Sequence, residues 1–345
     1  MNTQQPREAA IQRSPRPRRS LRLALLAVSL TALAPITAGA TFVEGPAAQA
    51  PVSMTTAQPA TPGYLTIQFG RAMWTVANGC TAIPGALTLA QIAQDLQARG
   101  MTAIGTVVVD RVDSGTKRYC QGDDMYANWA DLASLNTTYG WQFVSDGLTH
   151  GDMTTMTPAQ QQQESCGSLT PLESHGFNSA WGLFAYGDNH FTNQIQTNVV
   201  STCFAYGRTY RGGVNMRANM HAPWFQNTNS ITGGECNVVG QACYKLSTTN
   251  GKHYESPLTF EKLVAGEGTN QWIDLQFYRL VTGSGDISPE LSWNCTSSNW
   301  QLHWTSSTEM YCQNDFDAIM SDVPAGVVTA DPATVATAWG RTPPS

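Results

Sequence analysis

The chain has 345 residues, of which 41% are hydrophobic and 13% are charged, and its formal net charge at pH 7 is -6. Together with a pI near 5.5, this balance provides no basic surface for a nucleic acid, so we exclude DNA- and RNA-binding proteins. The length is enough for an export signal, a linker and one large domain.

The first forty residues are typical of an export signal. The apolar run LRLALLAVSLTALAPITAGA is too short and too broken to span a membrane stably, and it ends in small residues suited to cleavage after Ala40 or Ala50. Arg18 and Arg19 permit a twin-arginine signal, and a general secretory signal fits as well. We expect a secreted or cell-envelope protein with no membrane segment once residues 1–40 are removed. An uncleaved anchor is the alternative.

Residues 41–62 are rich in Ala, Pro and Thr and have little to bury, which predicts a linker. We expect one domain over residues 63–325. The last segment, 326–345, is predicted to be a flexible tail.

Strand and helix patterns alternate at the start of the domain. Tyr64–Phe69 predicts a strand, residues 87–100 predict a helix closed by a glycine, and Thr102–Val109 predicts a second strand. Asn128–Tyr139 has helical spacing, and Trp141–Ser145 alternates like a short strand. Strands separated by helices in this order indicate a parallel sheet, either a barrel or a doubly wound sheet.

The second half of the domain continues this pattern less regularly. Thr157, Pro158 and Gln160 provide the cap, first position and third position of a helix. Further strand candidates are three apolar runs: Trp181–Tyr186, Val199–Phe204 and Trp272–Val281.

All eight cysteines lie outside the predicted signal, and none forms a Cys-x-x-Cys pair. In an exported chain this pattern favours disulfides over zinc. Two local pairs are predicted, Cys236 with Cys243 across a turn and Cys295 with Cys312 across a hairpin.

One acid and one histidine stand four residues apart, at Asp146 and His150, between the third strand and the capped helix. Loops at the carboxyl ends of parallel strands carry the chemistry of α/β proteins, so these two residues are candidate metal ligands. Asp188 or His190 could complete such a site. The alternative is an Asp-Gly turn whose carboxylate orients the imidazole, with Asp188 and His190 in a surface loop.

From about Tyr64 to Phe316 the chain resembles the NodB-like polysaccharide deacetylases, carbohydrate esterase family four. The likeness is strongest over Trp129–Gly187, where a tryptophan-led helix, a strand, the Asp146 to His150 loop and a capped helix follow in the family's order. It implies a single-domain NodB-like distorted (β/α) barrel, to which the cysteine pattern adds disulfides. It also implies a divalent metal, usually zinc, held by two histidines and an aspartate, with a second aspartate as base and a late histidine as acid.

The motif positions carry different residues here. The Thr-Phe-Asp-Asp-Gly motif aligns with residues 66–70, so Gln68 holds the base position and Phe69 a metal-ligand position. An amide is not a base at neutral pH, and a phenyl ring has no lone pair for zinc. The His-x-x-x-His motif keeps His150 and replaces its other histidine with Asp146, which leaves these two as the candidate metal ligands.

The later motifs are altered as well. The Arg-x-Pro-Tyr-Gly motif becomes residues 183–187, which loses the arginine but keeps Tyr186, whose backbone N–H occupies the family's oxyanion position. The acid position holds Tyr278. We assign no catalytic residue and expect no cofactor, with zinc or another divalent metal only if the protein is active.

Trp300 and Trp304 share one face of a predicted hairpin over residues 293–312. Such a face can stack on sugar rings, so both are candidate substrate-binding residues. Packing in the core is the alternative.

The sequence favours an exported, catalytically degenerate deacetylase-family protein that acts on or binds cell-envelope glycan, such as peptidoglycan or a chitin-like polymer. A divergent metal-dependent hydrolase of N-acetyl groups is one alternative. A surface module that binds proteins is another.

Overall fold

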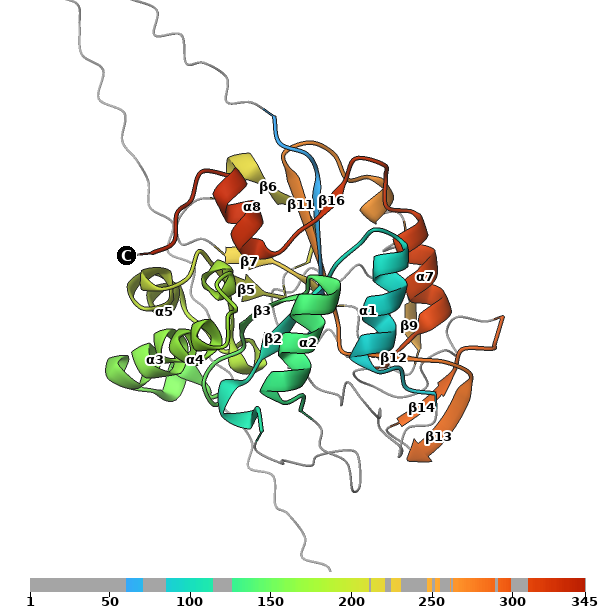
Figure 1. Ribbon diagram of the computed structural model, residues 1–345, viewed down its shortest axis with the longest axis horizontal. Coiled ribbons are helices and arrows are strands. Elements are labelled where there is room, and N and C mark those ends of the chain that lie inside the picture. The colour runs from blue at the N-terminus through green and yellow to red at the C-terminus, as the bar shows by residue number, and fades with distance from the viewer. Residues whose placement is uncertain are drawn as a thin grey trace, which may run out of the picture. The chain divides into compact units, whose positions relative to one another are not determined.

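Parallel strands alternate with helices along the chain and close into a distorted barrel (Figure 1). The computed structural model describes residues 60–70, 85–113, 126–210, 212–220, 225–230, 247–249, 252–254, 261, 263–288, 291–298 and 310–344, which all belong to one compact unit, Gln58–Ser345. The predicted signal, most of the linker, Trp300, Trp304 and the Cys236–Cys243 pair lie outside the described residues. Among the described helices, none is both long and apolar enough to cross a membrane.

The barrel strands pair in parallel in the order β11, β1, β2, β3, β4, β5, β7. The ring closes because β8, one residue after β7, pairs in parallel with β11. Their bounds are β1 Tyr64–Phe69, β2 Ile104–Val107, β3 Gln142–Ser145, β4 Leu183–Ala185, β5 Tyr206–Thr209, β7 Phe225–Asn227, β8 Asn229–Ser230 and β11 Gln271–Phe277. The predicted distorted (β/α) barrel is therefore confirmed.

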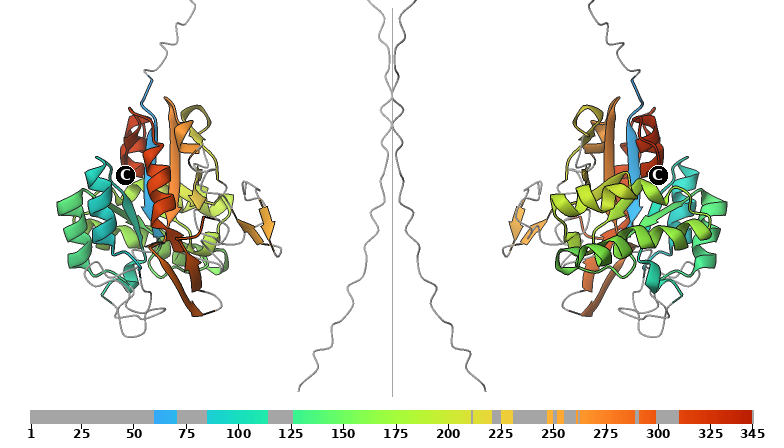
Figure 2. Two further views of the ribbon diagram at one scale, coloured as in Figure 1. Left: turned by 90° about the vertical axis from the view of Figure 1, so that its right-hand side faces the viewer. Right: turned by 90° about the vertical axis from the view of Figure 1, so that its left-hand side faces the viewer.

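Shorter strands extend the barrel or form separate ribbons. β6 (Asn215–Met216) and β16 (Val328–Thr329) add to β11 and β1 at their amino ends. The remaining strands pair among themselves, and they are β9 Ser247–Thr249, β10 Lys252–Tyr254, β12 Arg279–Val281, β13 Ser284–Ser288, β14 Leu291–Asn294 and β15 Met310–Cys312. The β13–β14 hairpin lies at one end of the barrel and α8 at the other (Figures 1 and 2).

Helices begin where the sequence supplies caps. The side chains of Thr88, Asn128 and Thr157 each accept a backbone N–H and form a complete capping box. The described α-helices are α1 Leu89–Ala98, α2 Trp129–Tyr139, α3 Pro158–Ser165, α4 Leu169–Ser174, α5 Asn193–Asn198, α7 Gln313–Ser321 and α8 Pro332–Ala338. The helices predicted after Thr88, Asn128 and Thr157 are confirmed.

Alternation along each strand separates an outer face from an inner face. On β1, Leu65, Ile67 and Phe69 point outward into a core shared with α1, α2 and α7. On β11, Ile273, Leu275 and Phe277 join the same core. The other residues of both strands therefore face the barrel interior.

The amino-terminal half of the interior is apolar. Tyr64, Trp272, Val144, Leu183 and Tyr206 pack there against residues of α8 and the segment before it. The hydroxyl of Thr66 provides hydrogen-bond partners for two buried polar groups of this layer. It accepts from the Trp272 Nε1 at 2.9 Å and donates to the Ala330 carbonyl at 2.7 Å.

The segment 326–345 differs from the predicted flexible tail. β16 pairs with β1, and α8 buries Val335 and Ala336 beneath the barrel. Asp331 caps α8 and Pro332 occupies its first turn, which is a start signal that the sequence reading missed.

The predicted strand Val199–Phe204 is wrong. Val200–Thr202 forms a 3-10 turn, and β5 begins only at Tyr206. Ile195, Val199, Val200 and Phe204 all join one buried cluster with Phe184 of β4. The apolar run is therefore buried without belonging to a strand.

The predicted strand Trp272–Val281 is divided in two. β11 ends at Phe277 and β12 begins at Arg279, so Tyr278 lies at the break. The predicted pair Cys295–Cys312 is confirmed, with 5.4 Å between the Cα atoms. The two cysteines do not join the two strands of one hairpin, since β14 pairs with β13 and β15 pairs with β12.

Candidate functional site

Asp146 follows β3 directly and points into the carboxyl-terminal half of the barrel. Its side chain is 1% exposed. Its backbone N–H donates to the Val107 carbonyl at 2.8 Å, and its Oδ2 accepts from the Thr106 hydroxyl at 3.3 Å. The strand thus delivers a buried carboxylate to the expected end of the barrel.

A buried arginine lies beside this carboxylate. Arg208 of β5 is 3% exposed, and its Nη2 is 3.8 Å from the Asp146 Oδ1. Its Nη1 donates to the Gln68 Oε1 at 3.4 Å, and its Nη2 donates to the Tyr210 hydroxyl at 2.7 Å. Burial disfavours its charge, but Tyr210, Asp146, Tyr278 and Asp274 together outweigh burial and raise the pKa of Arg208. A fixed positive charge therefore occupies the interior.

Asp274 of β11 is a second buried acid in the same space. Its Oδ2 accepts from the Thr228 hydroxyl at 2.6 Å and from the side-chain amides of Gln68 and Gln226. Burial raises the pKa of Asp274 to about 7, although these donors and Arg208 favour its charged form. Gln68 thus links Arg208 to Asp274 through its two ends.

Gln276 is a buried amide above Asp274 on the same face of β11. It is 0% exposed, and neither its Nε2 nor its Oε1 has a hydrogen-bond partner among the described residues. A buried polar atom without a partner costs about 1–3 kcal/mol. This side chain is therefore suited to pair with a polar group that enters the barrel.

His150 is held by its loop rather than by Asp146. Its Nε2 lies 4.0 Å from the Asp146 Oδ1, its side chain is 8% exposed, and its φ is +65°. The buried carboxylate of Glu164 on α3 accepts from the backbone N–H groups of Thr149 and Gly151, each at 3.1 Å, and from the Thr149 hydroxyl at 2.8 Å. Glu164 therefore sets the conformation of the His150 loop.

The Tyr186-Gly187 turn packs against the same loop. A Cβ on Gly187 would lie 2.7 Å from the His150 carbonyl oxygen, so no other residue fits without displacement. The Tyr186 side chain points outward, where its hydroxyl donates to the Gln196 side chain, and burial raises its pKa well above the usual value. Only the backbone of Tyr186 can therefore serve the predicted oxyanion role.

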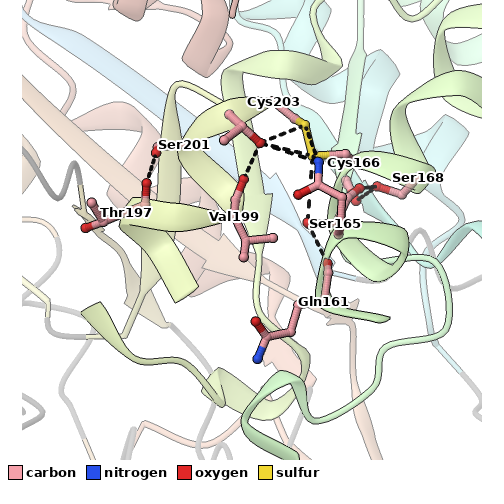
Figure 3. The surroundings of a disulfide bond; sticks show 11 residues. Gln161, Ser165, Cys166, Ser168, Thr197, Val199, Ser201 and Cys203 are labelled. Carbon is pink, nitrogen blue, oxygen red and sulfur yellow. Dashed lines mark hydrogen bonds between the residues drawn. A yellow bond between two sulfur atoms is a disulfide. The ribbon is translucent and has the colours of Figure 1, made fainter. Parts of the chain in front are cut away.

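A disulfide that the sequence reading did not predict anchors α3. Cys166 and Cys203 lie 5.5 Å apart at their Cα atoms and 37 residues apart in sequence (Figure 3). The Ser165 hydroxyl donates to the Gln161 carbonyl at 2.8 Å beside it. Closing a loop of this length stabilises a fold by about 4 kcal/mol in the chain-entropy model. The cross-link thus steadies the helix that carries Glu164.

Two phenols lie above the guanidinium. Tyr210 stacks on Arg208, with the Arg208 Cζ 4.8 Å from the ring centroid, and its hydroxyl is 3.2 Å from the Tyr278 hydroxyl. Both tyrosines are partly exposed. Tyr278, at the predicted acid position, thus connects to Asp146 through Tyr210 and Arg208.

Phe69 lies on the opposite side of β1 from this cluster. Its ring stacks on Trp141 and Phe277 at centroid distances of 5.4 and 5.8 Å, in the core between strands and helices. Phe69, which aligns with a metal-ligand position of the family, therefore points away from Asp146, because strand alternation turns residue 69 outward when residue 68 faces inward.

A divalent metal does not fit the described donor set. Zinc requires three or four lone-pair donors at about 2.0–2.3 Å, and Arg208 offers none and repels a cation. His190 contacts Asp152 at 3.4 Å. Over the residues that the structure describes, no group of three or more His, Cys, Asp or Glu side chains could hold a metal ion.

Arg208 and Asp274 are the site residues that sequence reasoning missed. Both belong to stretches where a polar residue alternates with residues of the outer face, namely YGRT and WIDLQF. Polar side chains on the inner face of a barrel strand are the signal that was available. Because a strand was predicted at Val199–Phe204, the strand that carries Arg208 was not predicted.

Solved structures that resemble this chain are carbohydrate esterases and deacetylases. One is the Xyl-CE4 domain of a xylanase from the hindgut metagenome of Trinervitermes trinervoides, with 12% identity over 82% of this chain and 94% of that chain and a TM-score of 0.43. Another is a family 4 carbohydrate esterase from Streptomyces lividans, with 14% identity over 62% of this chain and 79% of that chain and a TM-score of 0.34. A third is a polysaccharide deacetylase from Bacillus cereus, with 16% identity over 43% of this chain and 40% of that chain and a TM-score of 0.34. This chain therefore spans less than half the length of that protein. No family model and no curated protein matches the chain. At these identities and TM-scores the likeness assigns no activity.

Proposed function

We propose that this chain is an exported, catalytically degenerate relative of the polysaccharide deacetylases that binds cell-envelope glycan at the carboxyl-terminal mouth of its barrel. The observation that carries the proposal is Arg208, whose guanidinium lies between Gln68 and Asp146. These are the positions at which the sequence resemblance expects the base and a metal ligand.

The loss of the reaction follows from the chemistry of these groups. Gln68 cannot accept a proton from water at neutral pH, and its amide is engaged by Arg208 and Asp274. Asp146 faces a permanent cation, so a second cation at the same carboxylate is opposed by charge repulsion. Removing general acid-base help alone costs about 10²- to 10⁴-fold in rate.

Glycan binding is supported by the composition of the mouth. Tyr210 and Tyr278 offer partly exposed rings and hydroxyls, and Gln276 offers a buried amide without a described partner. Aromatic faces and neutral amides suit the ring faces and hydroxyls of sugars. Trp300 and Trp304 stay predicted contributors.

Retention on insoluble peptidoglycan or chitin, in the presence of a metal chelator, tests the proposal. We expect the protein to be retained, and Tyr210→Ala and Tyr278→Ala to weaken retention several-fold. Tyr139→Ala is the matched control, because Tyr139 ends α2 on the outer layer. Retention of both mouth variants at the wild-type level would refute binding at this surface.

The rival function is a divergent metal-dependent deacetylase that uses Asp146 and His150. The observation in its favour is that the Asp146 Oδ1 makes no hydrogen bond with the described residues and lies 4.0 Å from the His150 Nε2. Acetate release from an acetylated polymer, abolished in His150→Ala and by chelation, would establish it. A protein that neither releases acetate nor is retained on glycan would be the third candidate, a protein-binding module.

A further inference from the structure

A second polar recess lies at the amino-terminal end of the barrel, away from the mouth. Its volume is about 380 Å³, and it is lined by Tyr206, Arg217, Met220, Trp339, Arg341 and Thr342, together with one glycine. Pockets of about 300–1,000 Å³ are the usual size for small ligands. Neither the motifs of the sequence nor the proposed glycan binding uses this recess.

The fold brings three distant segments together here. Tyr206 is the first residue of β5, and Arg217 follows β6, which pairs with the amino end of β11. Trp339 and Arg341 follow α8 directly. The apolar layer around Trp272, which packs on both Tyr206 and Trp339 at centroid distances of 5.3 and 5.9 Å, closes the inner side of the recess.

Among the residues that the structure describes, the lining carries two guanidinium groups and no carboxylate. Backbone carbonyls orient both of them: Arg217 donates from its Nη2 to the Ala338 carbonyl at 3.4 Å, and Arg341 donates from its Nη1 to the Ala205 carbonyl. Burial lowers the pKa of Arg341, against the opposing influence of Tyr206. The lining therefore presents positive charge to the recess.

The rest of the lining includes an apolar wall. Tyr206 lies under Arg341, with the Arg341 Cζ 5.0 Å from its ring centroid. Its buried hydroxyl also lies beside Arg341, and burial raises the pKa of Tyr206 to about 12 against the opposing influence of that guanidinium. Trp339 and Met220 complete the wall. The recess thus joins positive charge and aromatic surface.

We propose that this recess binds a small organic anion, with a carboxylate or phosphate group between Arg217 and Arg341 and a planar body against Trp339 and Met220. Guanidinium groups bind both anions through paired N–H donors. The aromatic wall selects an anion with a ring or apolar body over a bare inorganic ion.

Isothermal titration calorimetry on the purified protein tests this with phenyl phosphate, benzoate, inorganic phosphate and phenol. We expect saturable 1:1 binding of phenyl phosphate or benzoate, and the stronger of the two identifies the anion. Inorganic phosphate and phenol should each bind at least tenfold more weakly. Equal binding of phenol would overturn the role of charge, and equal binding of inorganic phosphate would overturn the role of the wall.

Two variants locate the binding in the recess. Arg341→Met should weaken it tenfold or more, and Met220→Glu should do the same while leaving both arginines in place, which covers the case that Arg341→Met fails to fold. Arg99→Met is the matched control, because Arg99 pairs with Asp95 and Asp317 on the helical layer. Wild-type affinity in Met220→Glu, or an equal loss in Arg99→Met, would refute the proposal.

Discussion

The two halves of the barrel interior are built from opposite kinds of side chain. The amino-terminal half is apolar around Trp272 and is closed by α8, whereas the carboxyl-terminal half holds Arg208, Asp146, Asp274 and several amides. Buried apolar surface stabilises a fold, while a buried ion pair contributes little net stability. The comparison therefore indicates that the apolar half contributes more to the stability of the barrel than the polar half.

Trp272→Ala should give the largest loss of stability. The side chain is 0% exposed and packs against Tyr206 and Trp339, and its Nε1 donates to Thr66. Replacing a buried Trp by Ala costs about 3–5 kcal/mol, so the urea concentration at the midpoint of unfolding should fall strongly. Trp339→Ala, at the partly exposed edge of the same cluster, should cost clearly less. Equal losses would mean that the apolar half does not depend on its buried centre.

Arg208→Met should destabilise the protein by about 3 kcal/mol, because it leaves the buried Asp146 without its counter-charge. The double variant Arg208→Met, Asp146→Asn removes both charges and should recover most of this loss. Urea unfolding of the two variants measures the difference. A double variant no more stable than the single one would contradict the pairing of these charges.

Stability should fall as the pH rises from about 4 to 7, since the unfolded chain loses protons there that buried carboxyls retain. Burial raises the pKa of Asp274 to about 7 and that of Glu267, beside the amino ends of β1 and β11, to about 8. Each group contributes a slope of about 1.4 kcal/mol per pH unit while it is protonated only in the folded state.

Two variants separate the contributions of the two halves of the barrel to this dependence of stability on pH. Asp274→Asn should remove the share of the carboxyl-terminal half, and Glu267→Gln the share of the amino-terminal half. Free energies of unfolding at several pH values provide the measurement. An unchanged slope in Asp274→Asn would show that this carboxyl ionises normally in the folded protein.

Glu164→Gln should have the smallest effect, a loss of about 1–2 kcal/mol, because it weakens charge-assisted hydrogen bonds to the His150 loop. Hydrogen exchange of the Thr149 and Gly151 amides should accelerate, while amides of β1 and β11 stay protected. Exchange that is unchanged at these two amides would refute the role of Glu164 in holding the loop.

Local sequence signals predicted the elements that depend on caps and alternation. The capping boxes at Thr88, Asn128 and Thr157 and the strand at Tyr64–Phe69 could be read directly. The helix α8 carried an equally clear signal in Asp331 and Pro332. Its small apolar residues are also typical of a flexible tail, which is why the helix was not predicted. Their burial depends on the barrel end that they close.

The site was predicted only in part, because its central contacts join strands far apart in sequence. Asp146 and His150 were found from a local loop, but Arg208 meets Gln68 across 140 residues and Asp274 meets Gln68 across 206. Motif alignment also placed Phe69 in the site, although Leu65, Ile67 and Phe69 share the outward face. Alternation was the better guide to that side chain.

The metal content of the purified protein tests the central claim most directly. After incubation with excess zinc and extensive dialysis, we expect well under one zinc ion per chain, with no difference between wild-type protein and His150→Ala. The reason is that Arg208 already places a cation beside Asp146. Close to one zinc ion per chain, lost in His150→Ala, would contradict the account.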